Sequence, residues 1–278
     1  MSLNCCASPR RAHGIGVGML EWLDRIWRTF GTAISFAVFG LSCLLLAVCV
    51  FPCLYLVVRE PVRRSRVARR SVHLGHRFFI GLMRWFGLLT YDIRGAEKLR
   101  REGLLILANH PTLIDAVFLI GLVPNANCVV KASLARNFFT RGPIRAANYI
   151  SNDSGAGLVG DCVASLKMGD NLVMFPEGTR TRQGEPMCLQ RGAANIALRG
   201  PCDITPVTIR CEPISLTKGA PWWRVPTRPM HFTIEVGDDI PVAGFLAHAE
   251  GKLPLAARRL TDHLHTYFTQ EQPIHAVA

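Results

Sequence analysis

The stretch Leu104-Leu-Ile-Leu-Ala-Asn-His-Pro-Thr-Leu-Ile-Asp115 decides the fold class of this 278-residue chain. Its apolar run at 104–108 is short enough for a buried strand, and Pro111 favours the start of a helix directly after the strand. A strand that runs into a helix in this way is typical of α/β folds. Ligands bind at the carboxyl ends of strands in open α/β sheets, so His110 stands where a titratable side chain can act.

Short apolar runs of the same kind recur from Thr90 onward, and segments with helical periodicity, glycine or proline separate them. We expect strands at 91–94, 104–108, 128–131, 148–151, 172–175, 204–209 and 231–236. We expect helices at 114–122, 132–139, 158–167, 190–198 and 255–268. This alternation predicts an α/β fold with a mixed, mostly parallel sheet of about seven strands flanked by helices.

The N-terminal part of the chain differs from this pattern. No charged residue occurs from Phe30 to Val58, a run longer than the roughly 20 residues that a membrane-spanning helix needs. Pro52 leaves a second interpretation open, in which the segment bends and enters one leaflet only. Residues 71–89 predict an amphipathic helix. We therefore expect an N-terminal flank at 1–29, a membrane-anchoring helical segment at 30–89, the α/β domain at 90–269 and a disordered tail at 270–278.

The net charge of +12 raises the question of a nucleic-acid partner. The densest arginines, however, directly follow the apolar run, where they would meet anionic lipid headgroups, and no nucleic-acid-binding motif accompanies them. These arginines are Arg59, Arg63, Arg64, Arg66, Arg69 and Arg70. We expect no nucleic-acid partner. We expect a bacterial-type inner (cytoplasmic) membrane, and the positive-inside rule predicts that the α/β domain lies on its cytoplasmic side. The ten cysteines lack a CxxC pair and predict free thiols.

A second informative stretch is Asn171-Leu-Val-Met-Phe-Pro-Glu-Gly-Thr-Arg-Thr-Arg182, in which a strand ends in a polar turn. Gly178 permits an unusual backbone angle or a close approach of the backbone. Thr179 offers a hydroxyl, and Arg180 offers a bidentate fork that suits phosphate or carboxylate. The turn predicts a clamp for an anion or a glycerol hydroxyl, with a solvated surface turn as the alternative.

His110 and Asp115 are five positions apart, a spacing that would place them on different faces of one straight helix. If His110 precedes the helix and Asp115 lies in its first turn, the carboxylate can fold back on the imidazole. It would then fix the tautomer and support the imidazolium, which makes His110 a general base for a hydroxyl. The alternative is a histidine at a helix start with an acidic residue in the first turn.

Taken together, Asn109-His-x4-Asp115 followed by Phe175-Pro-Glu-Gly-Thr-Arg180 resembles the two main signatures of the glycerolipid and lysophospholipid acyltransferase family, the 1-acylglycerol-3-phosphate acyltransferase-like proteins. Three further blocks resemble the family in the same order. These blocks are Val130-Lys-Ala-Ser-Leu134, Gln190-Arg-Gly-Ala-Ala194 and Thr205-Pro-Val207. The resemblance covers residues 90–236.

The resemblance implies a membrane-bound O-acyltransferase. Its co-substrate would be acyl-CoA or an acyl carrier protein, and its acceptor a hydroxyl of a lysophospholipid or of a related lipid or glycolipid. No bound cofactor and no metal would be needed, and membrane lipids would be partners. His110 would be the base and Asp115 its partner. The substrate-binding residues would be Asn109, Thr112, Lys131, Glu177, Gly178, Thr179 and Arg180.

One position departs from the family pattern. Relatives that acylate lysophosphatidate resemble one another in an arginine a few residues into the strand between the two main motifs, where Asn152 or Asp153 stands here. Segments 142–154 and 190–213 further resemble acyltransferases found among the enzymes that make membrane-bound aryl polyene lipids. These features imply an acceptor with less charge near Asn152, and Arg141 or Arg145 could compensate.

Two other classes of function remain open. Gly155-Ala-Gly-Leu-Val-Gly160 spells the G-x-G-x-x-G fingerprint of dinucleotide-dependent oxidoreductases, with Glu177 near the place of a ribose-binding acid. A non-catalytic lipid-binding membrane protein is the third class. The histidine pairs His73/His76 and His263/His265 lack the further ligands that a metal site requires.

Overall fold

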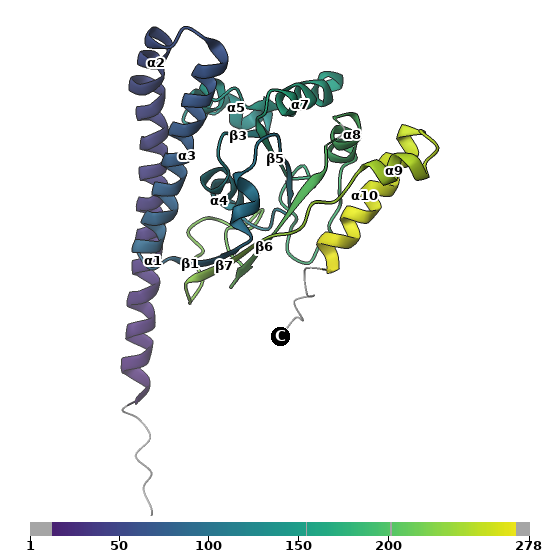
Figure 1. Cartoon of the computed structure of the whole chain (residues 1–278). Coiled ribbons are helices and arrows are strands. Elements are labelled where there is room, and N and C mark those ends of the chain that lie inside the picture. Colours follow the sequence, from purple (N-terminus) through teal and green to yellow (C-terminus); the bar gives the residue numbers. More distant parts are fainter. Residues whose placement is uncertain (1–12, 154, 201, 271–278) are drawn as a thin grey trace, which may run out of the picture.

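The computed structural model describes residues 13–153, 155–200 and 202–270. A long helical hairpin stands beside an α/β domain, and the last helix of the chain lies at the far side of that domain (Figure 1). The tail expected to be disordered falls mostly outside the described residues.

The hairpin contains the apolar run. Helix α1 (His13–Leu45), a π-helical turn (Leu46–Val50) and α2 (Phe51–Val57) follow one another without a break, and α3 (Pro61–Trp85) returns alongside them (Figure 1). The helix expected at 71–89 thus begins earlier, at Pro61. Proline is favoured at this first helical position, and the carboxylate of Glu60 accepts hydrogen bonds from the backbone N–H groups of Val62 (2.9 Å) and Arg63 (2.6 Å).

The sheet has seven strands in the order β1-β7-β6-β2-β5-β3-β4, and only the β6–β7 pair is antiparallel. The strands are β1 (Leu89–Arg94), β2 (Leu105–Ala108), β3 (Ala126–Val130), β4 (Ile150–Ser151), β5 (Asn171–Met174), β6 (Ile204–Glu212) and β7 (Met230–Val236). The predicted mixed, mostly parallel α/β sheet is confirmed. β2 and β5 are buried along their whole length because helices cover both faces of the sheet.

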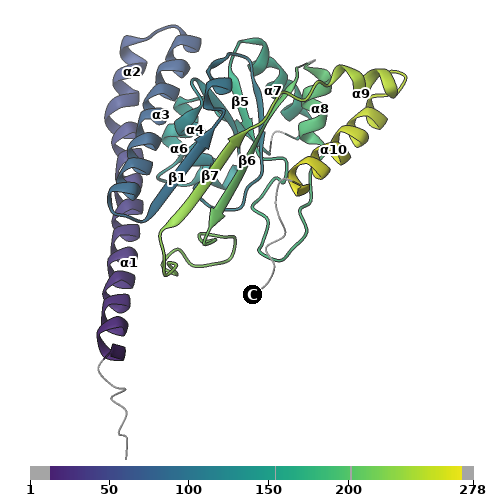
Figure 2. The ribbon, with the colours of Figure 1, turned by 60° about the horizontal axis from the view of Figure 1, so that its bottom comes forward.

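Two apolar clusters, one on each face of the sheet, form the core. The helices of the domain are α4 (Asp115–Leu122), α5 (Ala132–Arg136), α6 (Arg141–Ala146), α7 (Leu158–Lys167), α8 (Gly192–Arg199), α9 (Ala243–His248) and α10 (Leu253–Gln270). Helices α3 and α4 pack on one face, and α7, α8 and α10 on the other (Figure 2). The helix expected at 132–139 ends at Arg136, and the sequence did not predict α6 or α9. The cysteines in the described part of the chain are free thiols, as expected.

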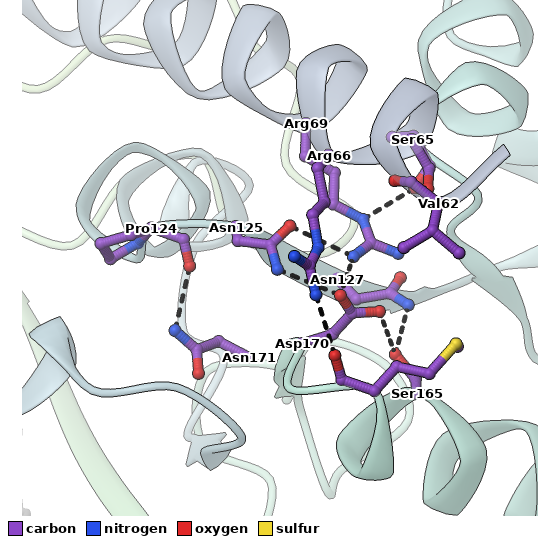
Figure 3. A network of polar contacts seen from close by, with 12 residues as sticks. Val62, Ser65, Arg66, Arg69, Pro124, Asn125, Asn127, Ser165, Asp170 and Asn171 are labelled. Atoms are coloured by element: carbon purple, nitrogen blue, oxygen red, sulfur yellow. Dashed lines mark hydrogen bonds and ion pairs between the residues drawn. The ribbon is translucent and has the colours of Figure 1, made fainter. Parts of the chain in front are cut away.

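A buried polar network fastens the hairpin to the domain (Figure 3). Arg69 of α3 is only 3% exposed and pairs with Asp170 at 2.5 Å. Its guanidinium also donates to the carbonyl of Ala147 (2.9 Å) and to Asn125 (3.3 Å), and Ser165 donates to Asp170 (2.9 Å). Arg69 is therefore unavailable to lipid headgroups, contrary to the sequence prediction. The network lies at the amino ends of β3 and β5, the edge of the sheet opposite His110.

Candidate active site

His110 and Asp115 meet at the carboxyl end of β2, as predicted. His110 lies just before α4 and Asp115 is the first residue of that helix, so the carboxylate folds back until its Oδ2 is 2.9 Å from Nδ1 of the imidazole. The buried carboxylate would hold the ring proton on Nδ1 and leave the lone pair on Nε2. The His110 side chain keeps 17% of its surface exposed, so a reactant can approach it.

Thr112 fixes the carboxylate of Asp115. Its backbone N–H donates to Oδ2 (2.6 Å) and its hydroxyl donates to Oδ1 (2.5 Å). Both Thr112 and Asp115 are fully buried. Thr112 was expected to bind substrate, but this arrangement gives it a supporting position behind the histidine.

Glu177 joins the second motif to the first. Its Oε1 accepts a hydrogen bond from the backbone N–H of His110 (2.7 Å), and its Oε2 accepts one from the hydroxyl of Thr181. Asn109 makes a similar link to β6, because its side-chain amide exchanges two hydrogen bonds with the backbone of Ile209 (2.8 and 2.7 Å). The side chains of Glu177 and Asn109, which were expected to contact substrate, are buried. Their polar atoms form the hydrogen bonds that hold the loop of His110.

The turn after β5 brings the remaining predicted residues together. Gly178 has φ of +69°, the left-handed conformation that glycine adopts freely. Thr179 accepts a hydrogen bond from Nζ of Lys131 (2.9 Å), and Arg180 donates to the carbonyl of Leu216 (2.9 Å). Burial lowers the pKa of the Arg180 guanidinium from its usual value, and the nearby Asp115 carboxylate opposes this shift. Lys131 and Arg180 thus form a cationic edge of the site beside His110.

Phe175 is a site residue that the sequence pattern did not single out. Its ring stacks on the imidazole of His110, with ring centroids 4.1 Å apart and an interplanar angle of 22°. In the sequence, Phe175 is marked only by its position as the last apolar residue before the turn. The stack itself joins residues that follow two neighbouring strands, so neither motif alone predicts it.

The position at which Asn152 or Asp153 replaces the arginine of the relatives lies at the sheet edge, after β4. Asn152 accepts a hydrogen bond from the backbone N–H of Ala132 (3.0 Å), and Asp153 accepts one from the hydroxyl of Ser151 (2.5 Å). Arg141 and Arg145 are exposed on the neighbouring α6. Arg141 lies over the ring of Phe138, 5.3 Å from its centroid.

The glycine fingerprint does not fit a dinucleotide site. In that fingerprint the last glycine allows a helix to pack closely on a strand. Here a Cβ at Gly160 would meet no atom within 4 Å, and the same holds for Gly155 and Gly157. The preceding strand, β4, has two residues and lies at the edge of the sheet. The oxidoreductase alternative therefore loses its structural basis.

Comparisons with known proteins point to one family. The 1-acyl-sn-glycerol-3-phosphate acyltransferase of Pseudomonas aeruginosa is 26% identical over 202 residues, which cover 70% of this chain and 73% of that protein. The enzyme of the same name from Limnanthes douglasii is 25% identical over 191 residues, 65% of this chain and 63% of the relative. The acl-2 protein of Caenorhabditis elegans is 34% identical over 146 residues, 48% of this chain and 49% of that protein. The chain thus spans about half of the length of the last relative and less than two thirds of the length of the one before it.

The crystal structure of the 1-acyl-sn-glycerophosphate (LPA) acyltransferase PlsC from Thermotoga maritima has the same fold. It superposes with a TM-score of 0.62 at 18% identity and covers 88% of this chain and 99% of its own. A family model described as Acyltransferase matches residues 90–210, which include His110, Asp115 and the Pro-Glu-Gly-Thr-Arg turn. Residues 90–210 of this chain therefore match the Acyltransferase family model, and the chain is similar to 1-acyl-sn-glycerol-3-phosphate acyltransferases.

Proposed function

We propose that this chain transfers a fatty acyl group from the thioester of acyl-CoA or of an acyl carrier protein to a hydroxyl of a lipid acceptor. The single observation that carries the proposal is the 2.9 Å contact between Nδ1 of His110 and the buried carboxylate of Asp115. This contact leaves Nε2 as the basic nitrogen, at a strand end where α/β enzymes bind their ligands.

The proposed reaction is a direct displacement. Nε2 of His110 takes the proton of the acceptor hydroxyl while the oxygen attacks the carbonyl carbon of the thioester. The carbon–sulfur bond breaks, and the leaving thiolate receives the proton from the imidazolium. Asp115 stabilises the imidazolium, and the stacked ring of Phe175 holds it in place. The step balances without a covalent enzyme intermediate or a bound cofactor.

Substrate contacts are assigned to the groups that border the histidine without being fully buried. Lys131, Thr179 and Arg180 supply charge and a hydroxyl, and the glycine at 178 allows close approach of the backbone. Asn109, Thr112 and Glu177 hold the loop in shape. The phosphates of coenzyme A, or the phosphopantetheine of a carrier protein, would meet the same cationic edge.

The first acceptor to test is 1-acyl-sn-glycerol 3-phosphate, because the relatives carry that activity in their names. A second class, hydroxylated lipids or glycolipids with less charge, is favoured by one observation. Asn152 and the carboxylate of Asp153 occupy the position of the expected arginine, so a phosphate there would lack a charge-assisted hydrogen bond of roughly 1.5 to 3 kcal/mol. The resemblance of 142–154 and 190–213 to acyltransferases of aryl polyene lipid synthesis points the same way.

The test is an assay of thiol release and of lipid products with purified protein, both donor types and a panel of acceptors that includes lysophosphatidate. Preference for lysophosphatidate over every non-phosphorylated acceptor would decide for the first class. His110→Ala should reduce turnover by roughly 10² to 10⁴. The matched control is His263→Ala, because His263 is exposed on α10 at the far side of the domain. Activity of His110→Ala within about tenfold of wild type would remove the mechanism.

We also propose that the hairpin attaches the chain to one leaflet of a membrane instead of crossing it. The apolar helix from Trp22 to Val57 has 36 residues and, at 1.5 Å per residue, is roughly 54 Å long, against about 30 Å of hydrocarbon. Arginines of α3 run beside its second half. Arg64, for example, lies over the ring of Tyr55 at 4.2 Å.

A perpendicular span would carry exposed arginines of this region into the hydrocarbon, at roughly 2.5 to 3.5 kcal/mol each. These arginines are Arg59, Arg63, Arg66 and Arg70. A hairpin that lies along the interface avoids this cost, since its apolar face enters the lipid and the arginines reach the headgroups. The side is proposed to be the cytoplasmic face of a bacterial-type inner membrane, because the arginines flank the apolar run on its carboxyl side.

A further inference from the structure

Two loops of the domain carry pairs of exposed aromatic side chains. The loop at 213–229, between β6 and β7, presents Trp222 and Trp223, and Trp223 is 58% exposed. The loop at 137–140, between α5 and α6, presents Phe138 and Phe139, and Phe138 is 59% exposed. Proteins seldom leave neighbouring large aromatic rings in water without a partner.

Both pairs meet α1, and they meet it at the same level. The ring of Trp222 lies 6.4 Å from that of Phe36, centroid to centroid. Phe139 Cδ1 would lie 3.7 Å from a Cβ at Gly40. Phe36 and Gly40 are one helical turn apart, a rise of roughly 6 Å. The two loops thus flank the same short part of α1.

The surface of α1 that points away from the domain is apolar at this level. The exposed apolar side chains along it include Phe30, Leu41 and Leu45 of α1 and Val48 of the π-helical turn that follows α1. The aromatic loops therefore continue an apolar surface that already exists on the hairpin. Basic side chains stand next to both tips. They are Arg224 and Arg228 on the first loop, and Arg136 and Arg141 beside the second.

We propose that Trp222, Trp223, Phe138 and Phe139 form a second lipid-binding surface, which inserts into the headgroup and upper acyl region of the same leaflet as α1. Tryptophan is enriched at membrane interfaces because its ring is apolar while its N–H is polar, and neighbouring arginines suit anionic headgroups. The continuity with α1 favours a bilayer over a protein as the occupant. This inference rests on the proposed membrane attachment and is independent of acyl transfer.

The surface also has a structural connection to the active site. The base of the first loop is held by the carbonyl of Leu216, which accepts hydrogen bonds from the backbone N–H of Leu113 (3.0 Å) and from Arg180 (2.9 Å). The second loop follows Lys131 by way of α5. Insertion of both tips would therefore place the cationic edge of the site at the lipid surface, where a lipid acceptor resides.

Quenching of tryptophan fluorescence by bromine tests the proposal. The full chain, with Trp22→Phe, Trp27→Phe and Trp85→Phe, keeps only Trp222 and Trp223 as tryptophans, whose emission is excited selectively over that of the four tyrosines. It is reconstituted in vesicles of phosphatidylcholine and phosphatidylglycerol, with or without bromine on the phosphatidylcholine acyl chains. We expect most of the emission to be lost in the brominated vesicles. The emission of Phe138→Trp, in a chain without the five native tryptophans, should be quenched in the same way.

The matched control removes all five native tryptophans by Phe substitution and adds Leu255→Trp. Leu255 is exposed on α10, across the domain from α1 (Figure 1). Its emission should not respond to bromine. Trp27 donates a hydrogen bond to the carbonyl of Phe86, so if its loss prevents folding, wild type is compared with Trp222→Phe/Trp223→Phe, and the bromine-sensitive emission must fall.

Flotation of the vesicles separates the possible failures. If the chain floats with the vesicles but the emission of Trp222 and Trp223 is unquenched, the loops face water and the inference is overturned. If that emission depends on protein concentration and not on bromine, a second copy covers the loops and the inference is equally overturned. If the chain does not float, the membrane attachment itself fails. Acyl transfer in detergent is untouched by any of these results.

Discussion

The charge of Asp115 can be tested apart from its shape. Asp115→Asn keeps an oxygen for Thr112 but removes the carboxylate that faces Nδ1 of His110. We expect kcat to lose a large part of the roughly 10² to 10⁴ that general-base catalysis contributes, because the imidazolium loses its support. Thermal unfolding and donor KM should be measured beside kcat. Asp161→Asn, at an exposed acid of α7, is the matched control, and a folded Asp115→Asn enzyme with near wild-type kcat would contradict the role.

Phe175 is expected to act through His110, so its effect should appear in turnover and not in binding. Phe175→Leu keeps an apolar side chain but removes the ring that lies 4.1 Å from the imidazole. We expect kcat to fall while the KM values for donor and acceptor stay near those of wild type. Phe175→Tyr should restore turnover, because the stack returns. A general loss of stability would instead lower both variants alike, which thermal unfolding would reveal.

At the level of single residues, the sequence predicted the contacts that are local in the chain. His110 and Asp115 meet because a strand end and a helix start are adjacent, and both signals are present in one string. The bonds from Glu177 to His110 and from Asn109 to Ile209 cross between strands, so they depend on the strand order, which the sequence did not specify. The sequence therefore did not predict the supporting bonds of Glu177 and Asn109, and their contact with substrate stays a prediction.

At the level of elements, all seven strands were predicted because each is a short apolar run between breakers. The short helices α6 and α9 were missed because six residues are too few to display a helical period. The start of α3 was within reach, since Glu60-Pro61 is an N-cap followed by a proline at the first helical position. The burial of Arg69 could not be predicted from the sequence, because its partner Asp170 precedes a strand far along the chain.

The Arg69–Asp170 pair should be a strong link between the hairpin and the domain. Asp170→Asn leaves the guanidinium of Arg69 buried without its counter-charge, and breaking a buried pair in this way typically costs about 3 to 5 kcal/mol. We expect a large fall in the midpoint of urea unfolding in detergent. Adding Arg69→Met should recover part of the loss, since the unpaired charge is removed.

The control for this prediction is the ion pair of Lys98 and Asp238. The carboxylate of Asp238 is exposed to solvent and lies 2.8 Å from the ammonium of Lys98. Asp238→Asn should change the unfolding midpoint little, because exposed ion pairs contribute little. Equal effects of the buried and the exposed substitution would show that the network of Figure 3 does not hold the hairpin.

At the level of the whole molecule, the hairpin lies on one side of the domain, while α9 and α10 lie on the other (Figure 1). Both aromatic loops contact α1, and the loop at 213–229 accepts a hydrogen bond from Arg180 of the site. This arrangement suits an enzyme whose base works at a lipid surface. The sequence reading left a single span and a one-leaflet anchor open, because an apolar run does not reveal what lies beside it. The return of α3, with its arginines along α2, supports the proposed one-leaflet anchor.

The two anchors differ in where they place the ends of the chain. If the hairpin lies in one leaflet, both ends stay on the cytoplasmic side, whereas a single span from Trp22 to Val57 would put the N-terminus on the opposite side. The side of each end can be measured with a split fluorescent protein. A short tag at that end restores fluorescence only if it meets the other fragment, which is expressed in the cytoplasm. We expect fluorescence from both tags, and an alkaline phosphatase fused after Ala278 should be inactive. Fluorescence from the C-terminal tag alone would establish the span and would place the arginines of α3 in a different environment from the one argued above.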